Sequence, residues 1–118
     1  MRHGKHKFVL GVDRAHRKSM MRNLAISLIE HGKIKTTNAK AKALRPYAEK
    51  LVTIAKADSV QARREAFSKL NNKEAVKMLF EKIAPKFKER AGGYTRITKL
   101  ADGRVGDGAQ VSYISFVE

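Results

Sequence analysis

A change in the spacing of apolar residues near Gly92-Gly93 divides the chain into two kinds of secondary structure. Before it, apolar side chains recur every three or four positions, as in helices that cover a core with one face. After it, short runs rich in β-branched and aromatic residues flank a loop of Gly and Asp, which is typical of a β-hairpin. The sequence therefore predicts an α+β domain whose helices precede its hairpin.

Two long helices are expected in the first half, each with a start signal. The first spans residues 14–31, with Asp13 as N-cap and Gly32 as the left-handed stop. Its first turns carry cations on the face that later becomes apolar, so they are expected to project beyond the core. The second runs from Thr37 as N-cap to about residue 56, and Pro46 is expected to kink or divide it.

Two shorter helices are expected next. Asp58 would cap one over residues 59–70, and the other would cover residues 73–84 and end before Pro85. The residues that the 59–70 helix is expected to turn inward are Val60, Phe67 and Leu70.

Three strands complete the expected architecture, at residues 33–36, 94–100 and 111–117. A two-stranded sheet is marginal, so the first strand is expected to join the hairpin. The predicted fold is helix, strand, three helices and hairpin, with a small three-stranded mixed sheet packed by helices. Residues 14–118 would form this single domain, and residues 1–13 a basic extended N-terminal tail.

Positive charge is abundant and uneven. The net charge is +15, and the first 50 residues hold 13 of the 26 Lys and Arg but only three of the 11 acids. Self-repulsion at this density implies a polyanionic partner. The chain has no cysteine, which excludes disulfides and thiolate-bound metal. No apolar run approaches the roughly 20 residues that span a bilayer, so a soluble, unprocessed chain is expected.

Cations stand at both long-helix entrances, where the helix dipole disfavours them. Arg14, Arg17 and Lys18 open the first helix, and Lys40 and Lys42 open the second. A cation there costs about 0.3–1 kcal/mol, whereas an anion gains as much. Phosphates docking at the two entrances, on free N–H groups and side-chain cations together, would explain the arrangement. The alternative is a generally basic surface whose charges fell there by chance.

The kind of nucleic acid follows from what the pattern lacks. There is no helix-turn-helix or zinc-finger spacing, and no aromatic-rich strand of the kind that stacks single-stranded bases. The cations are spread over the tail, the helix entrances and the loops, which favours a large folded RNA over one groove of DNA.

Three other functions compete with binding to a folded RNA. A small ribonuclease or metal-dependent hydrolase would use His3 and His6, but neighbouring cations repel a metal ion and no nucleophile motif is present. A DNA-compacting protein would have a composition like this one, but the dispersed cations argue against that function. A membrane-surface binder would need interfacial aromatics that the first helix lacks. No enzymatic activity, cofactor or metal is expected.

Several sequence runs then point to one family. They are MRH at the start, HR at 16–17, RN at 22–23, SLIEHGKIKTT at 27–37 and RAGGYTRITKL at 90–100. With Lys40-Ala41-Lys42 and Glu49, they resemble the bacterial large-subunit ribosomal protein family that is seventeenth in that subunit's numbering, along the whole chain. The chain departs from the family at residues 8–13, which are less basic, and at Ala43 and Pro46.

The resemblance implies a structural constituent of the large ribosomal subunit with no catalytic activity. It implies binding and stabilisation of large-subunit rRNA near the exit of the nascent-chain tunnel, in the cytoplasm, beside neighbouring ribosomal proteins. It also implies a three-stranded sheet with helices. Neither a membrane nor a small-molecule substrate is expected as a partner.

The expected RNA contacts combine residues that match the family with cations of the tail, helix entrances and loops. They are Arg2, His3, Lys5, Lys7, Arg14, His16, Arg17, Lys18, Arg22, Lys33, Lys35, Thr36, Thr37, Lys40, Lys42, Arg45, Arg90, Tyr94, Arg96 and Arg104. Tyr94 has an equal alternative as an aromatic that packs the sheet. His16 is expected to be a hydrogen-bonding group and not a catalytic one.

Overall fold

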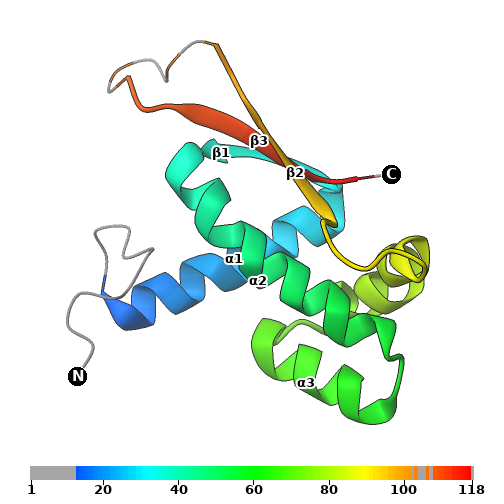
Figure 1. The fold of residues 1–118 in the computed structure, drawn as a ribbon. Coiled ribbons are helices and arrows are strands. Elements are labelled where there is room, and N and C mark those ends of the chain that lie inside the picture. Colours follow the sequence, from blue (N-terminus) through cyan, green and yellow to red (C-terminus); the bar gives the residue numbers. More distant parts are fainter. Residues whose placement is uncertain (1–12, 102, 104–105, 107, 118) are drawn as a thin grey trace, which may run out of the picture.

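The computed structural model describes residues 13–101, 103, 106 and 108–117. Figure 1 shows the sheet above α2, with α1 crossing behind α2 and α3 below both. The helical and strand bounds are α1 Arg14–His31, β1 Lys33–Thr37, α2 Asn38–Lys56, α3 Val60–Leu70, α4 Lys73–Met78, β2 Thr95–Lys99 and β3 Val111–Phe116. The expected order of elements is confirmed. No helix of the described part is long and apolar enough to cross a membrane.

Both ends of α1 form as the sequence indicates. The Asp13 side chain accepts a hydrogen bond from the His16 backbone N–H at 2.7 Å, and Gly32 closes the helix with φ 76°. The buried residues of α1 begin only at Met21. The turns before Met21 therefore extend past the core, as predicted, and Figure 1 shows this end of α1 reaching away from the other helices.

Helix α2 passes through Pro46 without being divided, so of the two predicted outcomes division does not occur. Proline cannot donate to the carbonyl four residues earlier, which belongs to Lys42. Both Pro46 and Lys42 are exposed, so water can satisfy that carbonyl. At the start of α2 the Thr37 hydroxyl accepts from the Lys40 N–H at 3.4 Å, which confirms Thr37 as the N-cap.

Helix α3 differs from the prediction in its cap and in its buried face. Its N-cap is Ser59, whose hydroxyl accepts from the Ala62 N–H at 3.0 Å, and not Asp58. Val60 is 67% exposed and Phe67 40% exposed, so neither turns inward. The buried residues are Ala62, Ala66 and Leu70, spaced four apart. Alanine at two of these positions lets α3 approach its neighbours closely, and the larger side chains remain outside.

The fourth helical segment continues beyond the predicted stop at Pro85. After α4 the backbone forms a π-helical turn over Leu79–Ile83 and a 3₁₀ turn over Ala84–Phe87. Pro85 lies in the first turn of the 3₁₀ segment, where a missing N–H breaks no hydrogen bond. This continuation carries Phe87 into the core, where it is buried.

The sheet has the order β1-β3-β2, and both pairings are antiparallel, so the expected mixed sheet is wrong. Strand β3 is the most buried of the three and takes the centre, while the more charged β1 and β2 become edges. Because β3 lies between the two strands that run in the same direction, no parallel pair forms. The sheet packs with one face toward α2, and its other face points away from that helix.

Register assigns residues to those two faces. Ile114 pairs with Ile34 and Ile97, and all three pack in or against the core. The Ser112 hydroxyl, two residues away on the same face, donates to the Asn38 side-chain oxygen in α2 at 2.9 Å. The intervening residues of β3, with their partners on β1 and β2, therefore form an outer face.

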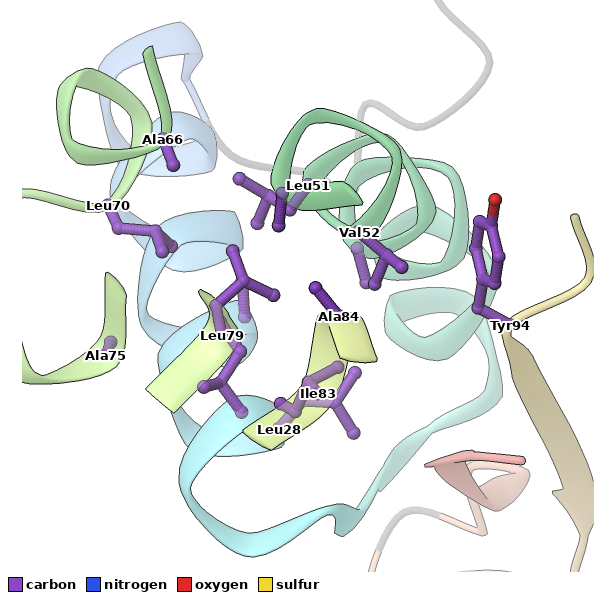
Figure 2. Packing of buried hydrophobic residues seen from close by; sticks show 14 of the residues in the cluster. Leu28, Leu51, Val52, Ala66, Leu70, Ala75, Leu79, Ile83, Ala84 and Tyr94 are labelled. Atoms are coloured by element: carbon purple, nitrogen blue, oxygen red, sulfur yellow. The ribbon is translucent and has the colours of Figure 1, made fainter. Parts of the chain in front are cut away.

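One hydrophobic cluster joins all of these elements. Figure 2 shows Leu28, Leu51, Leu79 and Ile83 converging from α1, α2 and the π-turn. Ile114 and Tyr94 extend the cluster to the sheet. The basic segments described next are thus held on one rigid core.

Candidate nucleic-acid interface

Five predicted contacts cannot be placed. Arg2, His3, Lys5, Lys7 and Arg104 lie outside the described residues. The path of residues 8–12, where the chain departs from the family pattern, lies outside them too. These positions stay predictions.

The entrance of α1 presents a set of cations on a helix that extends past the core. Arg14, His16 and Lys18 are exposed, Arg17 is half-buried, and the first turn holds no acid. The backbone N–H groups of His16 and Arg17 already donate to Asp13, at 2.7 and 2.9 Å. The prediction that free N–H groups receive phosphate is therefore wrong for these two residues. Side chains and the helix dipole must supply the attraction.

Arg22 continues this cationic side of α1 toward the core. It is half-buried, and its Nε atom has no hydrogen-bond partner among the residues the structure describes. A buried donor left unpaired costs about 1–3 kcal/mol. Arg22 therefore carries a donor that an incoming anionic acceptor would satisfy.

Tyr47 of α2 lies close enough to Arg22 to interact with its charge. Burial raises the pKa of Tyr47, and the positive charge of Arg22 opposes part of that rise. The Tyr47 hydroxyl donates to the Lys69 carbonyl oxygen at 3.0 Å. That hydrogen bond links α2 to α3 and fixes the surroundings of the Arg22 side chain.

The entrance of α2 repeats the pattern of α1. Its first turn has no acid, Lys40 is half-buried and Lys42 is exposed. The Asn38 N–H donates to the Gln110 carbonyl at 2.8 Å and the Lys40 N–H to Thr37. These two N–H groups are also used within the fold. Thr36 and Thr37 are half-buried, and Thr37 serves as the cap.

A groove beside this entrance brings together cations from two distant parts of the sequence. Lys42 and Arg45 of α2 face Lys99 of β2 across a hollow of about 710 Å³, and no acid lines it. Lys99 was missed from sequence because its role depends on β2 lying beside α2. Its position two residues after Ile97, on the core-facing side of an edge strand, was the available signal.

Arg45 is partly engaged within the fold. Its Nε lies 3.4 Å from Glu49 Oε2, an exposed pair that is worth at most about 1 kcal/mol. The same Glu49 oxygen accepts from the Thr95 hydroxyl at 2.9 Å. Glu49 therefore ties α2 to β2 and sets the width of the groove.

The outer face of the sheet is also basic. Lys33, Lys35 and Arg96 lie on it, in register with Ser115 and Tyr113. The Lys33 ammonium sits 4.3 Å from the centre of the Tyr113 ring, a cation–π contact that holds it over the sheet. Figure 1 shows the helices on the opposite side of the sheet.

Arg90 and Tyr94 are placed by the loop between the helices and β2. The Arg90 Nε donates to the Gly92 carbonyl at 3.1 Å, and Gly93 adopts φ 63°, which favours glycine. Arg90 is exposed, but part of its donor capacity is used locally.

Tyr94 packs the sheet rather than facing outward. It is 3% exposed, and its ring centre lies 5.2 Å from that of Phe87. Its hydroxyl accepts from the Lys56 ammonium at 3.0 Å, which lowers the pKa of Tyr94 below its usual 10.0. This packing favours the alternative in which Tyr94 is a sheet-packing aromatic, and a contact of Tyr94 with RNA stays a prediction.

Comparisons with known proteins agree on one family. Residues 20–117 match the family described as Ribosomal protein L17. A relative from Methylacidiphilum infernorum, named large ribosomal subunit protein bL17, is 49% identical over 118 residues, which are 100% of this chain and 89% of that protein. A protein of the same name from Persephonella marina is 59% identical over 103 residues, covering 86% of this chain and 83% of that protein.

Proposed function

The chain belongs to the ribosomal protein L17 family, and on that premise we propose that it binds large-subunit rRNA through the entrances of α1 and α2 and the surfaces beside them. As a member of this family it is a structural constituent of the large ribosomal subunit and not an enzyme. It acts in the cytoplasm as part of the ribosome.

The observation that carries the RNA proposal is that four of the entrance cations form no ion pair with a carboxylate in the described part of the chain. Within the described part of the chain, ion pairs form at Arg45–Glu49 and Arg63–Asp58. None reaches Arg14, Lys18, Lys40 or Lys42 there. Arg14 and Lys40 stand in the first turn of their helices, at the positive end of the dipole, so they cost stability in the free protein, whereas Lys18 and Lys42 follow in the second turn. A phosphate bound there would interact favourably with both the helix dipole and the cations, and this would offset the cost.

The shape of this surface favours a folded RNA. The α1 entrance reaches beyond the core, while the α2 groove and the outer sheet face carry further cations. Contacts so far apart suit a polyanion that curves around the protein. Among the described β-strand pairs, Tyr113 is the only aromatic residue on the outer sheet face, so this face offers little for stacking single-stranded bases. Placement near the nascent-chain tunnel exit rests on the family likeness alone. Partners among the neighbouring ribosomal proteins rest on it too.

The test is salt-dependent binding of the purified protein to a folded large-subunit rRNA. Lys40→Ala with Lys42→Ala removes two proposed phosphate contacts, so the slope of log affinity against log salt should fall by about two units. A matched control is Lys73→Ala with Lys77→Ala, two exposed cations of α4 outside the interface. An unchanged slope in the first variant, or an equal fall in both, would contradict the proposal.

Duplex DNA serves as the competitor in the same assay. A protein shaped for folded rRNA should prefer it over DNA of equal charge at every salt concentration. Equal affinity for the two would instead support the DNA-compacting function that the composition allows.

A further inference from the structure

A second surface lies at the opposite end of α1 from the entrance cations. It is a groove of about 720 Å³ between the end of α1, the start of β1, the π- and 3₁₀-turns and the end of β3. We call it the basic-rimmed groove. Apart from Lys33, Arg96 and Ser115, which also belong to the outer face of the sheet, its residues belong to no surface described above.

The floor of the basic-rimmed groove is apolar. Met78, Phe116 and Val117 line it, and each is half-buried while packing against the core. The Phe116 ring is tilted by 46° against Phe87, at 6.1 Å between ring centres. Apolar side chains left facing water at the bottom of a hollow favour an occupant that also has apolar side chains.

The rim of the same groove is cationic. Lys82, Lys86 and Arg96 are exposed, and in the described part of the chain none of them has a carboxylate partner. Glu30 is the one acid among the lining residues. An occupant that complements this rim must carry negative charge.

Two occupants with negative charge must be compared, RNA and an acidic polypeptide. RNA would offer phosphates to the rim, but its bases need flat aromatic faces on which to stack. Phe87 is buried, and Phe116 lies tilted against it, so the floor offers no such platform. A polypeptide can present carboxylates to the rim and apolar side chains to the floor at the same time.

The chain's own N-terminal residues do not fit this chemistry. Residues 1–12 contain Arg2, Lys5 and Lys7 and no acid, so the cationic rim would repel them. An intramolecular occupant from that end is therefore disfavoured by charge alone.

From charge complementarity and the apolar floor, we propose that the basic-rimmed groove docks an acidic segment with apolar side chains from a neighbouring protein of the large subunit. This inference rests on the proposed function, because it assumes assembly into the subunit. It would give the molecule two contact surfaces of different chemistry, one for RNA and one for protein.

The test uses the full chain assembled into large subunits in cells. A photo-reactive benzoylphenylalanine replaces Lys82 on the rim, and in a second strain it replaces Gln61, which is exposed on α3. Purified subunits are irradiated, and adducts are digested with ribonuclease or protease and mapped by mass spectrometry. The expected adduct from position 82 resists ribonuclease and maps to a polypeptide segment with net negative charge and apolar residues. Position 61 should not give that adduct.

Charge at the rim supplies a second test in the same strain. Lys86→Glu should lower the yield of this adduct by about tenfold, because like charges then face each other. Lys86→Arg keeps the charge and should leave the yield unchanged. Neither change touches a residue assigned to RNA binding.

The outcomes separate the two proposals. An RNA adduct, a basic peptide, the same adduct from both positions, no polypeptide adduct in subunits that contain the chain, or a yield that Lys86→Glu leaves unaltered overturns the groove inference alone. Absence of the chain from the large subunit contradicts the proposed function, and the groove inference falls with it.

Discussion

The helix entrances of this molecule share one way of capping but differ in charge. Each α-helix in the described chain begins with a side chain that accepts a hydrogen bond from the N–H three residues later. The caps are Asp13, Thr37, Ser59 and Asn72. Capping therefore serves folding wherever a helix starts.

The charges follow a different rule. At α3 the Arg63 guanidinium meets the Asp58 carboxylate at 3.2 Å, and the first turn of α4 contains Glu74. The first turns of α1, α2 and α3 all contain no acid, but Arg63 of α3 has a carboxylate partner, whereas within the described chain no ion pair reaches Arg14 or Lys40. If the proposed function holds, stability shaped the entrances of α3 and α4, whereas those of α1 and α2 give up some stability to hold charge for RNA.

The largest effect should come from the core that both pairs of entrances share. Leu28→Ala removes a fully buried side chain of α1 and should destabilise the fold by roughly 2–5 kcal/mol in urea unfolding. The variant that remains folded should keep the same salt slope for rRNA. A changed slope would mean that the core and the RNA contacts are not separable.

Loss of a cap should come next and should be similar on both sides of the comparison. Asp13→Ala in α1 and Asn72→Ala in α4 each remove one acceptor, and each should cost about 1 kcal/mol in urea unfolding. If Asp13→Ala were neutral while Asn72→Ala was costly, capping at α1 would not serve folding, and the comparison would fail.

Lys56 is a cation with hydrogen-bond partners inside the fold, so it should contribute to stability and not to RNA binding. Lys56 donates to the Tyr94 hydroxyl and to the Arg90 carbonyl, so Tyr94→Phe should cost roughly 0.5–1.5 kcal/mol and leave the rRNA salt slope unchanged. Weaker RNA binding at unchanged fold would support Tyr94 as a contact.

The pH dependence of the same variant has a definite sign. Folding lowers the pKa of Tyr94, so the unfolded chain keeps that proton to higher pH. The wild-type protein should therefore gain stability over Tyr94→Phe as pH rises from the lowered pKa toward the ordinary value of 10.0. Unfolding curves over that range measure the difference, and an opposite trend would contradict the Lys56 hydrogen bond.

The smallest effect is a reciprocal exchange of charge between the two kinds of entrance. Arg14→Glu should stabilise the free protein by about 0.3–1 kcal/mol, and Glu74→Lys should destabilise it by a similar amount. Arg14→Glu should also lower the rRNA salt slope by at least about one unit, whereas Glu74→Lys should not lower it. Destabilisation by Arg14→Glu would show that the cation serves the fold.

The ends of α1 and α2 could be predicted because their signals are local. Asp13, Gly32 and Thr37 act through hydrogen bonds to residues three or four positions away, so sequence alone contains both partners. The projection of the first turns of α1 was predictable for a similar reason, since cations cannot enter a dry core unpaired.

The failures depend on contacts between distant segments. The buried face of α3 is formed by Ala62, Ala66 and Leu70; Leu70 was predicted, but the two alanines carry little hydrophobic signal of their own. The burial of Tyr94 depends on Phe87, and Phe87 reaches the core only because the chain continues past Pro85. Lys99 joins the interface because β2 lies beside α2. The spacing of four in α3 and the step of two from Ile97 to Lys99 are visible in the sequence, but the elements that these residues face are not.

The first turns of α1 have a consequence for how the protein meets its partner. They lie before the first buried residue of α1, and among the described residues the backbone N–H groups of His16 and Arg17 donate to Asp13. Short helical segments without tertiary support open readily, and their amide hydrogens exchange fast with solvent. In the free protein this segment should exchange rapidly, and in the assembled subunit slowly. Part of the free energy gained from the contacts of this segment would then be used to order it. The measured affinity of the protein for its partner would therefore be lower than those contacts alone would give.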